Sequence, residues 1–396
     1  MKNKVKILCI DIEGGKGGSS RSLFYALEAI SKKKSFSKLD ITVICRIDSW
    51  IKEEYQKIGI KCIIDKSMPR FTPLQRFSRN IYQFVIFFLI KWPRSNKFRT
   101  LLKEMENCDV LHFNHISLSF LAWWCKLKKI GKKRTMHIRT MPPKNFFSKT
   151  LYQISSYSCK AFIYITENEK NYLHELINQP PLFEKVIHNP VKLNHNITSK
   201  LLEGEKRFKI GILSSFSYER GIDRVLEIFL SIPKDKRHKF VFVIAGDMTL
   251  EKNIPNFSKK LLSRSKYFYD YIRHLGIEKN FIFLGQVNKP EEVLQNINVL
   301  LKPTRLNNPW GRDILEALSY GKPVISVGTY NKFVDNNKTG LLQSHFNAKE
   351  IANWLIKLQK STSFQKKFNL ECKSRIYAYC FPKKVSQYLL NAWIKN

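Results

Sequence analysis

Residues 307–326 read NNPWGRDILEALSYGKPVIS, and this stretch decides the fold. Turn-forming residues lead into a helix-forming segment at residues 313–318, and a Gly-Lys-Pro turn then leads into an apolar strand. A loop, a short helix and a strand in this order are typical of a parallel α/β sheet. The pattern places one carboxylate, Glu316, inside a helix that begins just after a glycine.

The same alternation of strand and helix patterns extends outward over most of the chain. It pauses at residues 192–206, which are polar and lack hydrophobic periodicity, and it restarts at residue 208. A chain of 396 residues is too long for one ordinary core. We therefore predict an α/β protein with two Rossmann-like domains, residues 1–195 and 207–376, facing each other across a cleft.

The formal net charge of +37 is high, and both halves of the chain contribute to it. Nucleic acid, an anionic membrane surface or phosphorylated small molecules are possible partners, and a solvated Lys-rich surface without a partner is the plain alternative. No homeodomain, zinc-finger or RNA-recognition motif accompanies the charge, so we expect no dedicated nucleic-acid binding.

Eight cysteines are scattered along the chain without any CxxC pair, and several lie in apolar strand patterns. This usage predicts buried thiols in a reducing cytoplasm rather than disulfides or a zinc site. The apolar run near the first residue is too short for a signal peptide.

Residues 81–92, IYQFVIFFLIKW, raise the question of a membrane. The run is shorter than the roughly 20 residues that a spanning helix needs. Because basic residues flank it, we predict a helix that lies in an anionic leaflet. A core-facing helix is the alternative. The expected membrane contacts are Phe84, Phe87, Phe88 and Trp92.

A glycine-rich turn, GGKGGSSRSL, occupies residues 14–23 after the first strand pattern. It fits neither the dinucleotide-binding fingerprint nor the P-loop. We expect a helix capped by Ser19 or Ser20, with backbone amides near Gly17 and Gly18 that suit an anion or a sugar hydroxyl. An ordinary tight turn is the alternative.

Several motifs together resemble a known family. RGID (220–223), VIAGD (243–247), FIFLGQV (281–287), LLKPT (300–304), the opening stretch and NNKTGLL (336–342) follow the order found in retaining glycosyltransferases of the GT-B fold, family 4 type, also called glycosyl transferases group 1. The first half resembles this family more loosely, through DVLHFNH (109–115), TMHIRT (135–140), AFIYITENEK (161–170) and VIHNPV (186–191). The resemblance implies that a C-terminal helix, residues 377–396, crosses back to the first domain.

The resemblance also implies roles for single residues. The second glutamate of the family's Glu-x7-Glu pair falls on Glu316, which would hold the donor's ribose, and Arg220 would face its diphosphate. His137 would contact the transferred sugar rather than act as a base. The implied donor-binding residues are Gly17, Gly18, Arg220, Gly285, Val287, Gly311, Arg312, Asp313, Ile314, Leu315 and Glu316. The implied acceptor-binding residues are His112, His115 and Arg139, the last of which would contact an acceptor phosphate.

The chain departs from the family pattern at two places. Asn308 replaces the first glutamate of the pair, which lies near the transferred sugar, so we count Asn308 with His137 and Glu316 as candidate catalytic residues. Gly211-Ile212 lacks the basic residue that often follows the first glycine of the second domain.

The predicted function is a retaining glycosyltransferase that uses a nucleotide-diphosphate sugar and no cofactor. No D-x-D pair is present to hold a metal ion, so we expect none. The basic surface and residues 81–92 point to a lipid-linked or polysaccharide acceptor of O-antigen, capsule or lipopolysaccharide synthesis, at the cytoplasmic face of the inner membrane. The alternatives are a nucleotide-sugar 2-epimerase of the same fold and, because of Asn308, a catalytically weak nucleotide-sugar-binding protein.

Overall fold

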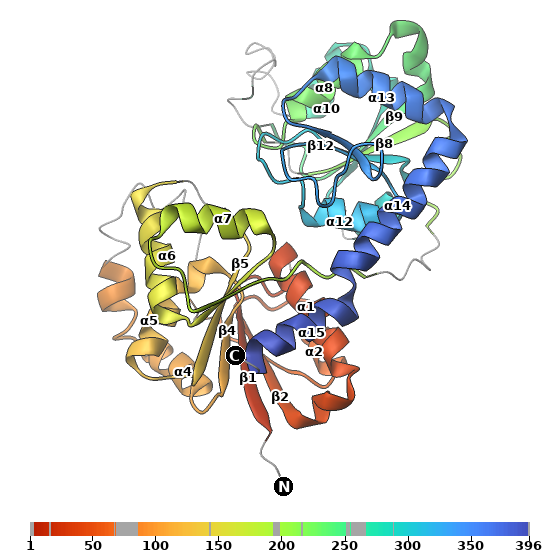
Figure 1. Ribbon diagram of the computed structural model, residues 1–396. Helices are drawn as coiled ribbons and strands as arrows, with labels where there is room; N and C mark the ends of the chain where they lie inside the picture. Colours follow the sequence, from red (N-terminus) through yellow and green to blue (C-terminus); the bar gives the residue numbers. More distant parts are fainter. Residues whose placement is uncertain are drawn as a thin grey trace. The chain divides into compact units, whose positions relative to one another are not determined.

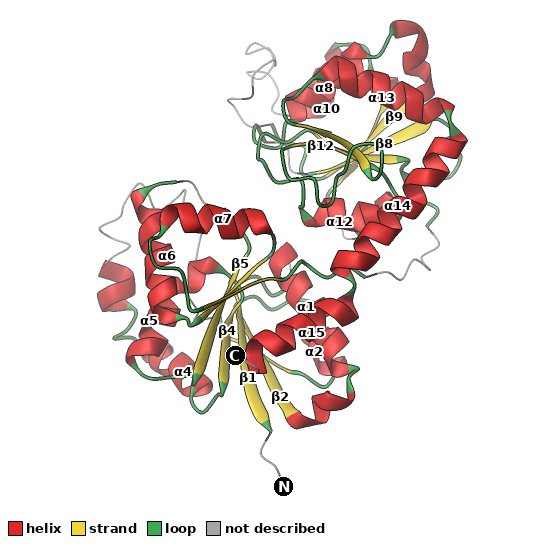
Figure 2. Ribbon diagram, in the orientation of Figure 1, coloured by secondary structure: helices red, strands yellow, loops and turns green. Residues whose placement is uncertain are grey.

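The computed structural model describes residues 4–394 apart from residues 16, 67, 69–85, 142–143, 193–198, 215–216, 251–253, 255–266 and 288. The chain divides into two compact units, of which the first contains Met1–Pro190 and Cys380–Asn396 and the second contains Val191–Tyr379. Each unit is a parallel sheet with helices on both faces (Figure 1, Figure 2). The predicted α/β class is therefore confirmed.

The first unit contains a sheet of seven parallel strands in the order β3-β2-β1-β4-β5-β6-β7. The order reverses direction at β1, which places β1 and β4 at the switch point where such sheets bind ligands. The strands are β1 (Val5–Asp11), β2 (Leu39–Cys45), β3 (Lys61–Ile64), β4 (Val110–Phe113), β5 (Lys133–Ile138), β6 (Ala161–Tyr164) and β7 (Phe183–Val186).

Both faces of this sheet are buried because the strands are apolar on both sides. In β1, Ile7 and Cys9 belong to one core cluster, whereas Leu8 and Ile10 belong to another on the opposite face. The first cluster includes residues of α1 (Gly18–Ser31), α2 (Ile51–Lys57) and α15 (Pro382–Ile394). The second includes residues of α4 (Asn96–Met105), α5 (Ser119–Leu127), α6 (Phe146–Ser158) and α7 (Glu167–Leu176).

The C-terminal helix α15 belongs to the first unit, although its sequence follows the second. Its apolar residues Leu389 and Trp393 share a core cluster with Leu23 and Phe24 of α1. Figure 1 shows α15 beside α1 and α2. The last helix of the chain therefore packs within the first unit.

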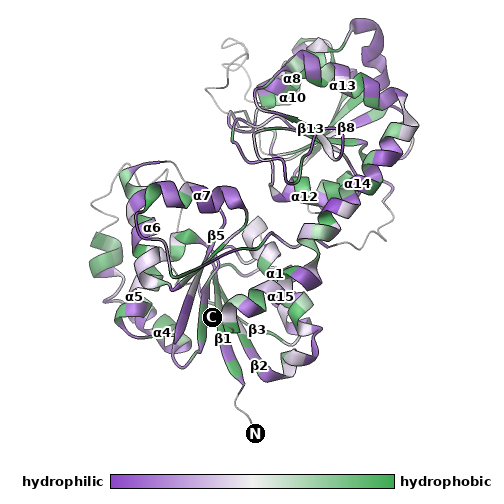
Figure 3. Ribbon diagram, in the orientation of Figure 1, coloured by the Kyte–Doolittle hydropathy of each residue, from purple (hydrophilic) through white to green (hydrophobic). Residues whose placement is uncertain are grey.

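The second unit contains six parallel strands in the order β10-β9-β8-β11-β12-β13. They are β8 (Phe208–Leu213), β9 (Phe240–Ala245), β10 (Phe281–Gly285), β11 (Val299–Lys302), β12 (Val324–Val327) and β13 (Gly340–Gln343). The helices are α8 (Ile222–Ser231), α10 (Phe268–His274), α11 (Pro290–Asn296), α12 (Arg312–Ser319), α13 (Ala348–Lys360) and α14 (Thr362–Cys380). Apolar residues of α8, α10, α13 and α14 share one core cluster with the strands. Figure 3 shows hydrophilic and hydrophobic residues alternating along α8 and α13.

Ser361 separates α13 from α14, because it leaves the helical conformation and its Oγ accepts a hydrogen bond from the Phe364 amide, 3.2 Å away, at the start of α14. All eight cysteines are buried and none forms a disulfide, which confirms the expectation of buried thiols.

The segment assigned to a membrane surface is only partly exposed. Phe84 lies outside the described residues, and residues 87–91 form one π-helical turn. Phe88 is 2% exposed and stacks on Phe120, while Trp92 is 4% exposed and packs against Phe98. The prediction that Phe88 and Trp92 contact a membrane is therefore wrong, because both fill the core of the first unit. Phe87 is 39% exposed.

In the part of the chain that the structure describes, no helix combines the length and the hydropathy that crossing a bilayer requires.

Candidate functional site

Two helices of the second unit begin at the carboxyl ends of the neighbouring strands β8 and β11, and each begins after a glycine. Gly221 precedes α8 with φ +74°, and a Cβ there would lie 2.1 Å from the carbonyl oxygen of Pro303. Only glycine fits this close approach in that backbone conformation. Gly311 precedes α12 with φ −58°, a backbone conformation that other residues also adopt. In helices the first-turn amides point out of the amino end, so both helix starts are directed to the edge of the sheet where α/β proteins bind ligands.

A buried ion pair fixes the loop after β11 to the start of α8. Arg305 donates from Nη1 and Nη2 to the two carboxylate oxygens of Asp223 at 2.9 and 2.7 Å, and its guanidinium lies 3.9 Å from the ring centre of Tyr218. The Asp223 side chain is fully buried. This two-bond pairing holds the two loops in one arrangement. The sequence analysis did not single out Arg305 or the role of Asp223.

Glu316 and Arg312, both expected to bind the donor, lie one turn apart on α12. The Arg312 Nε lies 2.7 Å from Glu316 Oε1, and both side chains are largely buried. The pair holds the Glu316 carboxylate in a fixed position beside the helix. Ile314 and Leu315 point into the core, so only their backbone is available to a ligand.

A second buried pair lies at the first turn of α12. Lys302, the last residue of β11, places its Nζ 2.8 Å from Asp313 Oδ1. A Cβ on Gly311 would lie 2.2 Å from this Nζ, so the ammonium lies directly beneath the glycine. The sequence analysis quoted LLKPT only as part of a motif and assigned Lys302 no role.

The remaining donor-side candidates line the same sheet edge. Arg220 is half-buried and forms no ion pair with the described residues. Gly285 has φ +65° and open space where a Cβ would stand, and Val287 is half-buried beyond it. The Asn308 Oδ1 is buried and has no hydrogen-bond partner among the described residues.

The corresponding edge of the first unit contains a network centred on Arg139. Its guanidinium donates to Asn114 Oδ1 at 2.7 and 3.0 Å, to Asn189 Oδ1 at 2.7 Å and to His137 Nδ1 at 3.1 Å. Asn114 in turn donates to Asp11 Oδ1 at 3.1 Å. Arg139 thus already has protein partners, and an acceptor phosphate would have to share or displace them.

The three candidate histidines differ in accessibility. Burial and the charge of Arg139 hold the pKa of His137 well below its usual range and lower that of His112 to about 3. Both rings are therefore neutral near pH 7. His112 is fully buried between Thr135, His137 and Trp393, and an acceptor has no surface by which to reach it.

His115 caps a short turn by accepting a hydrogen bond from the Ser117 amide at 3.1 Å, which is a structural role.

The start of α1 differs from the expectation. The helix begins at Gly18 with Gly17 as its cap and no side-chain cap, so the prediction of Ser19 or Ser20 at that position is wrong. Ser20 bonds to Asp11, and Ser19 bonds to Glu13 at 2.5 Å.

The Glu13 carboxylate fills the space next to Gly17 in which we expected a ligand. A Cβ at Gly17 would lie 1.8 Å from Glu13 Oε2. Burial, followed by the nearby charge of Asp11, raises the pKa of Glu13. A ligand of Gly17 and Gly18 would first have to displace this carboxylate.

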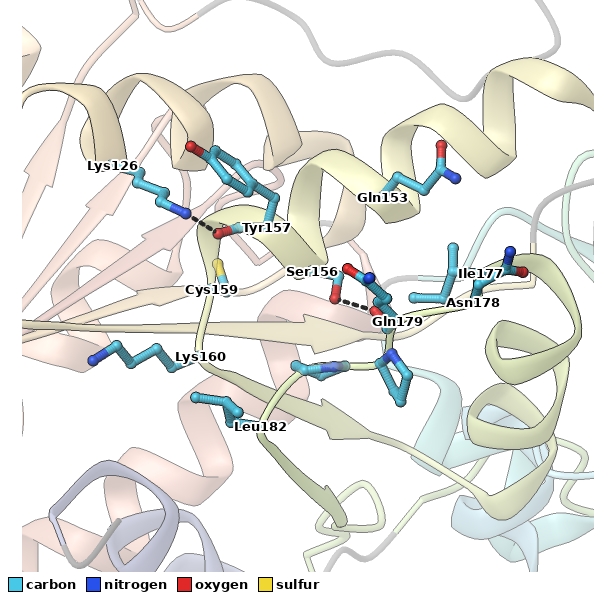
Figure 4. A pocket seen from close by; sticks show the side chains of 12 residues that line it. Lys126, Gln153, Ser156, Tyr157, Cys159, Lys160, Ile177, Asn178, Gln179 and Leu182 are labelled. Atoms are coloured by element: carbon cyan, nitrogen blue, oxygen red, sulfur yellow. Dashed lines mark hydrogen bonds between the residues drawn. The ribbon is translucent and has the colours of Figure 1, made fainter.

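A cavity of about 620 Å³ lies elsewhere in the first unit, beside the starts of β6 and β7 (Figure 4). Lys126 donates to the Tyr157 carbonyl at 2.6 Å, and Ser156 to the Gln179 carbonyl at 2.7 Å. Since the cavity lies at the amino ends of the strands, it is not part of the ligand edge. Among the described residues, no three His, Cys, Asp or Glu side chains gather where they could hold a metal ion.

The comparisons with known proteins cover the part of the chain that contains Arg220, Lys302 and Glu316. The family model of glycosyl transferases group 1 matches residues 194–375. Over these residues the chain is similar to that family. The protein is accordingly a glycosyltransferase.

Relatives extend the likeness to the rest of the chain. The chain is 24% identical over 262 residues to the O-antigen biosynthesis glycosyltransferase WclY of Escherichia coli. The aligned residues are 60% of this chain and 66% of that protein. It is 22% identical to an uncharacterized protein of the cps region of Klebsiella pneumoniae, over 78% of this chain and 81% of that protein. The structure of Anabaena HepE with UDP and glucose has a TM-score of 0.76 at 17% identity, over 99% of this chain and 100% of the other. This last likeness shows that the glycosyltransferase has the GT-B fold.

Proposed function

We propose that this glycosyltransferase transfers a hexosyl residue from a nucleotide-diphosphate sugar, with retention of configuration, to a lipid-linked or polysaccharide acceptor of O-antigen, capsule or lipopolysaccharide synthesis. The observation that carries the proposal is the pair of glycine-capped helix starts beside Glu316 and Arg220. Support for the donor class comes from HepE, which binds UDP and glucose. Support for the acceptor class comes from the O-antigen and cps-region relatives.

Three groups of the second unit each bind one part of the donor. The Glu316 carboxylate, held by Arg312, accepts hydrogen bonds from the ribose hydroxyls. The amides at the start of α12 bind the diphosphate, as helix starts bind anions. Arg220 compensates the charge that develops on the leaving diphosphate, and the proposal therefore includes no metal ion.

We assign to His137 a hydrogen bond to a hydroxyl of the transferred sugar. Its Nδ1 accepts a hydrogen bond from Arg139, which leaves the proton on Nε2. Because the ring is neutral and its pKa is low, it donates a hydrogen bond rather than removing a proton from the acceptor. The leaving phosphate then receives the acceptor proton on the same face of the sugar, which gives retention.

Glu316→Ala tests the donor assignment. We would first find which of UDP, GDP, ADP and CDP binds the wild type most tightly by calorimetry, and then compare it with its 2′-deoxy form. The wild type should prefer the ribonucleotide, and the variant should lose about tenfold or more in affinity together with that preference, because bonds to a charged acceptor contribute about 1.5–3 kcal/mol. The control is Glu227→Ala, an exposed glutamate of α8. An unchanged preference for the ribonucleotide in Glu316→Ala would remove the assignment.

A catalytically weak binding protein is the second candidate, because Asn308 stands where the family has a glutamate. Incubation with a radiolabelled UDP-sugar and an extract of lipid-linked glycans separates the two functions. Label in the lipid fraction supports transfer, whereas donor that binds and is recovered intact supports the binding protein. An epimerised donor would identify a 2-epimerase instead.

We propose further that the protein binds the anionic cytoplasmic face of the inner membrane through the π-helical turn at residues 87–91. Phe87, Leu89 and Ile90 are 39%, 36% and 44% exposed. Four exposed cations flank them: Lys91, Arg94, Lys97 and Arg99. Apolar side chains rimmed by positive charge match the interface of an anionic bilayer.

Sedimentation with anionic vesicles tests this surface. Replacement of Phe87, Leu89 and Ile90 by Ser should weaken vesicle binding about tenfold or more, since each buried apolar side chain contributes roughly 1.5–3 kcal/mol. Phe146→Ser is the matched control, because Phe146 is 85% exposed on a different helix, α6. Equal binding by the triple variant and the control would refute the surface.

A further inference from the structure

The buried pair of Lys302 and Asp313 has no part in the function proposed so far. Lys302 is 7% exposed and Asp313 is 23% exposed, so the carboxylate is the more accessible member. Asp313 is the second residue of α12, at the helix start where the diphosphate is proposed to bind. A negative side chain therefore lies among the amides that would receive an anionic ligand.

A carboxylate at this position has two possible effects on the donor. If it were unpaired, its negative charge would interact with the positive end of the helix in place of the ligand, and it would repel the diphosphate. When it is paired with a cation from below, its charge is compensated and one oxygen is held toward the interior. The 2.8 Å distance from Lys302 Nζ to Asp313 Oδ1 shows the paired arrangement.

The fold sets Lys302 in place for this task. Leu300 pairs with Gly211 of β8, and Lys302 lies two residues further along β11, at the carboxyl end of the strand. A Cβ at Gly311 would lie 2.2 Å from the Lys302 Nζ and 2.5 Å from Asp313 Oδ1. Glycine at this cap is what leaves room for the ion pair.

We propose that Lys302 is a positioning residue of the donor site, which neutralises Asp313 and keeps the first-turn amides of α12 available to the donor's diphosphate. This inference rests on the proposed function. Lys302 is too deeply buried to be the main contact of the ligand itself, so it acts through Asp313. Its effect falls on the diphosphate and not on the nucleoside.

The test compares Lys302→Met, Asp313→Asn and the double variant by calorimetry. The ligands are the nucleoside diphosphate that the wild type prefers among UDP, GDP, ADP and CDP, and the matching nucleoside. Lys302→Met exposes the diphosphate to an uncompensated carboxylate, so its affinity for the diphosphate should fall about tenfold or more, whereas its affinity for the nucleoside should stay within about twofold. Removal of the carboxylate in Lys302→Met/Asp313→Asn should restore diphosphate affinity to within about threefold of the wild type.

Asp313→Asn alone keeps the ammonium and removes the repelling charge, so it should bind the diphosphate at least as tightly as the wild type. This variant also decides the question if Lys302→Met fails to fold, since a loss of diphosphate affinity in a folded Asp313→Asn protein overturns the proposal.

Other outcomes are equally decisive. A double variant that stays as weak as Lys302→Met would show that the ammonium contacts the phosphate or only supports the fold. An equal loss for the nucleoside in Lys302→Met would show a general structural role. Either result overturns the inference and leaves the proposed function standing. If the wild type binds none of the four nucleotides, the proposed function fails, and this inference fails with it.

Discussion

At the scale of single residues, the donor-side edge buries several charges and pairs each of them. The ion pairs are Arg305 with Asp223, Lys302 with Asp313, and Arg312 with Glu316. Such pairs need not make the fold more stable than apolar residues would, but removal of one member leaves a buried charge unmatched. The pairs therefore fix the shape of this edge more than they add to overall stability.

Asp223→Ala should lower the free energy of unfolding by about 1.5–3 kcal/mol, because Arg305, whose side chain is 20% exposed, would lose both of its carboxylate bonds. Urea denaturation followed by circular dichroism measures the change. Glu54→Ala is the control, since its pair with Lys57 is exposed to solvent and its loss should leave stability nearly unchanged. A similarly small effect for Asp223→Ala would show that the pair does not hold the loops.

The buried histidines predict how stability depends on pH. The pKa of His112 in the folded chain is about 3, below the ordinary value near 6.5 that applies in the unfolded chain. As the pH falls below about 6.5, His112 is protonated in the unfolded chain but not in the folded chain, so the free energy of unfolding decreases. Above that pH the full contribution of His112 to stability is present.

At pH 5.5 this loss should be about 1.4 kcal/mol for His112. His112→Asn should therefore lose about that much less than the wild type between pH 7.5 and pH 5.5 in urea titrations. Identical losses in the two proteins would contradict the assigned pKa.

At the scale of elements, the last helix completes the core of the first unit. Trp393 is 1% exposed, and its ring lies 5.3 Å from that of His112 in β4. The helix thus covers the sheet on the face that α1 also covers. Its packing connects the end of the chain to the strand that ends beside the Arg139 network.

Trp393→Ala should destabilise the first unit by about 3–5 kcal/mol, because it leaves a large cavity beneath α15. Ile394→Ala is the neighbouring control, since Ile394 is 49% exposed and should change stability by about 0.5 kcal/mol or less. Thermal unfolding of both variants measures the difference. Equal melting temperatures would show that α15 is not part of the core.

At the scale of the whole molecule, the net charge of +37 should govern association with anionic surfaces. The range of such attraction shrinks from about 10 Å in 0.1 M salt to about 3 Å in 1 M salt. Binding to anionic vesicles should therefore weaken about tenfold or more between these two conditions. Binding that is insensitive to salt would assign the affinity to Phe87, Leu89 and Ile90 alone.

The architecture was largely predictable from the sequence, because parallel strands and amphipathic helices leave periodic patterns and because the residues around Glu316 form an ordered motif. The partners of the site residues were not. Lys302 and Asp313 are eleven positions apart in the sequence, and Asp223 and Arg305 are eighty-two positions apart. Phe88 and Trp92 were misassigned because a run that is apolar on every side does not reveal which side is buried.

Because the thiols are buried, each one becomes reactive only when the structure around it unfolds, so the cysteines can report on local unfolding. Seven of the eight cysteines (9, 45, 62, 108, 125, 159 and 380) lie in the first unit, and Cys372 alone lies in the second. Burial raises the pKa of Cys372 and suppresses its reactive thiolate. Pulsed alkylation read by peptide mass spectrometry would therefore time the unfolding of each half separately in the natural chain, without an introduced probe.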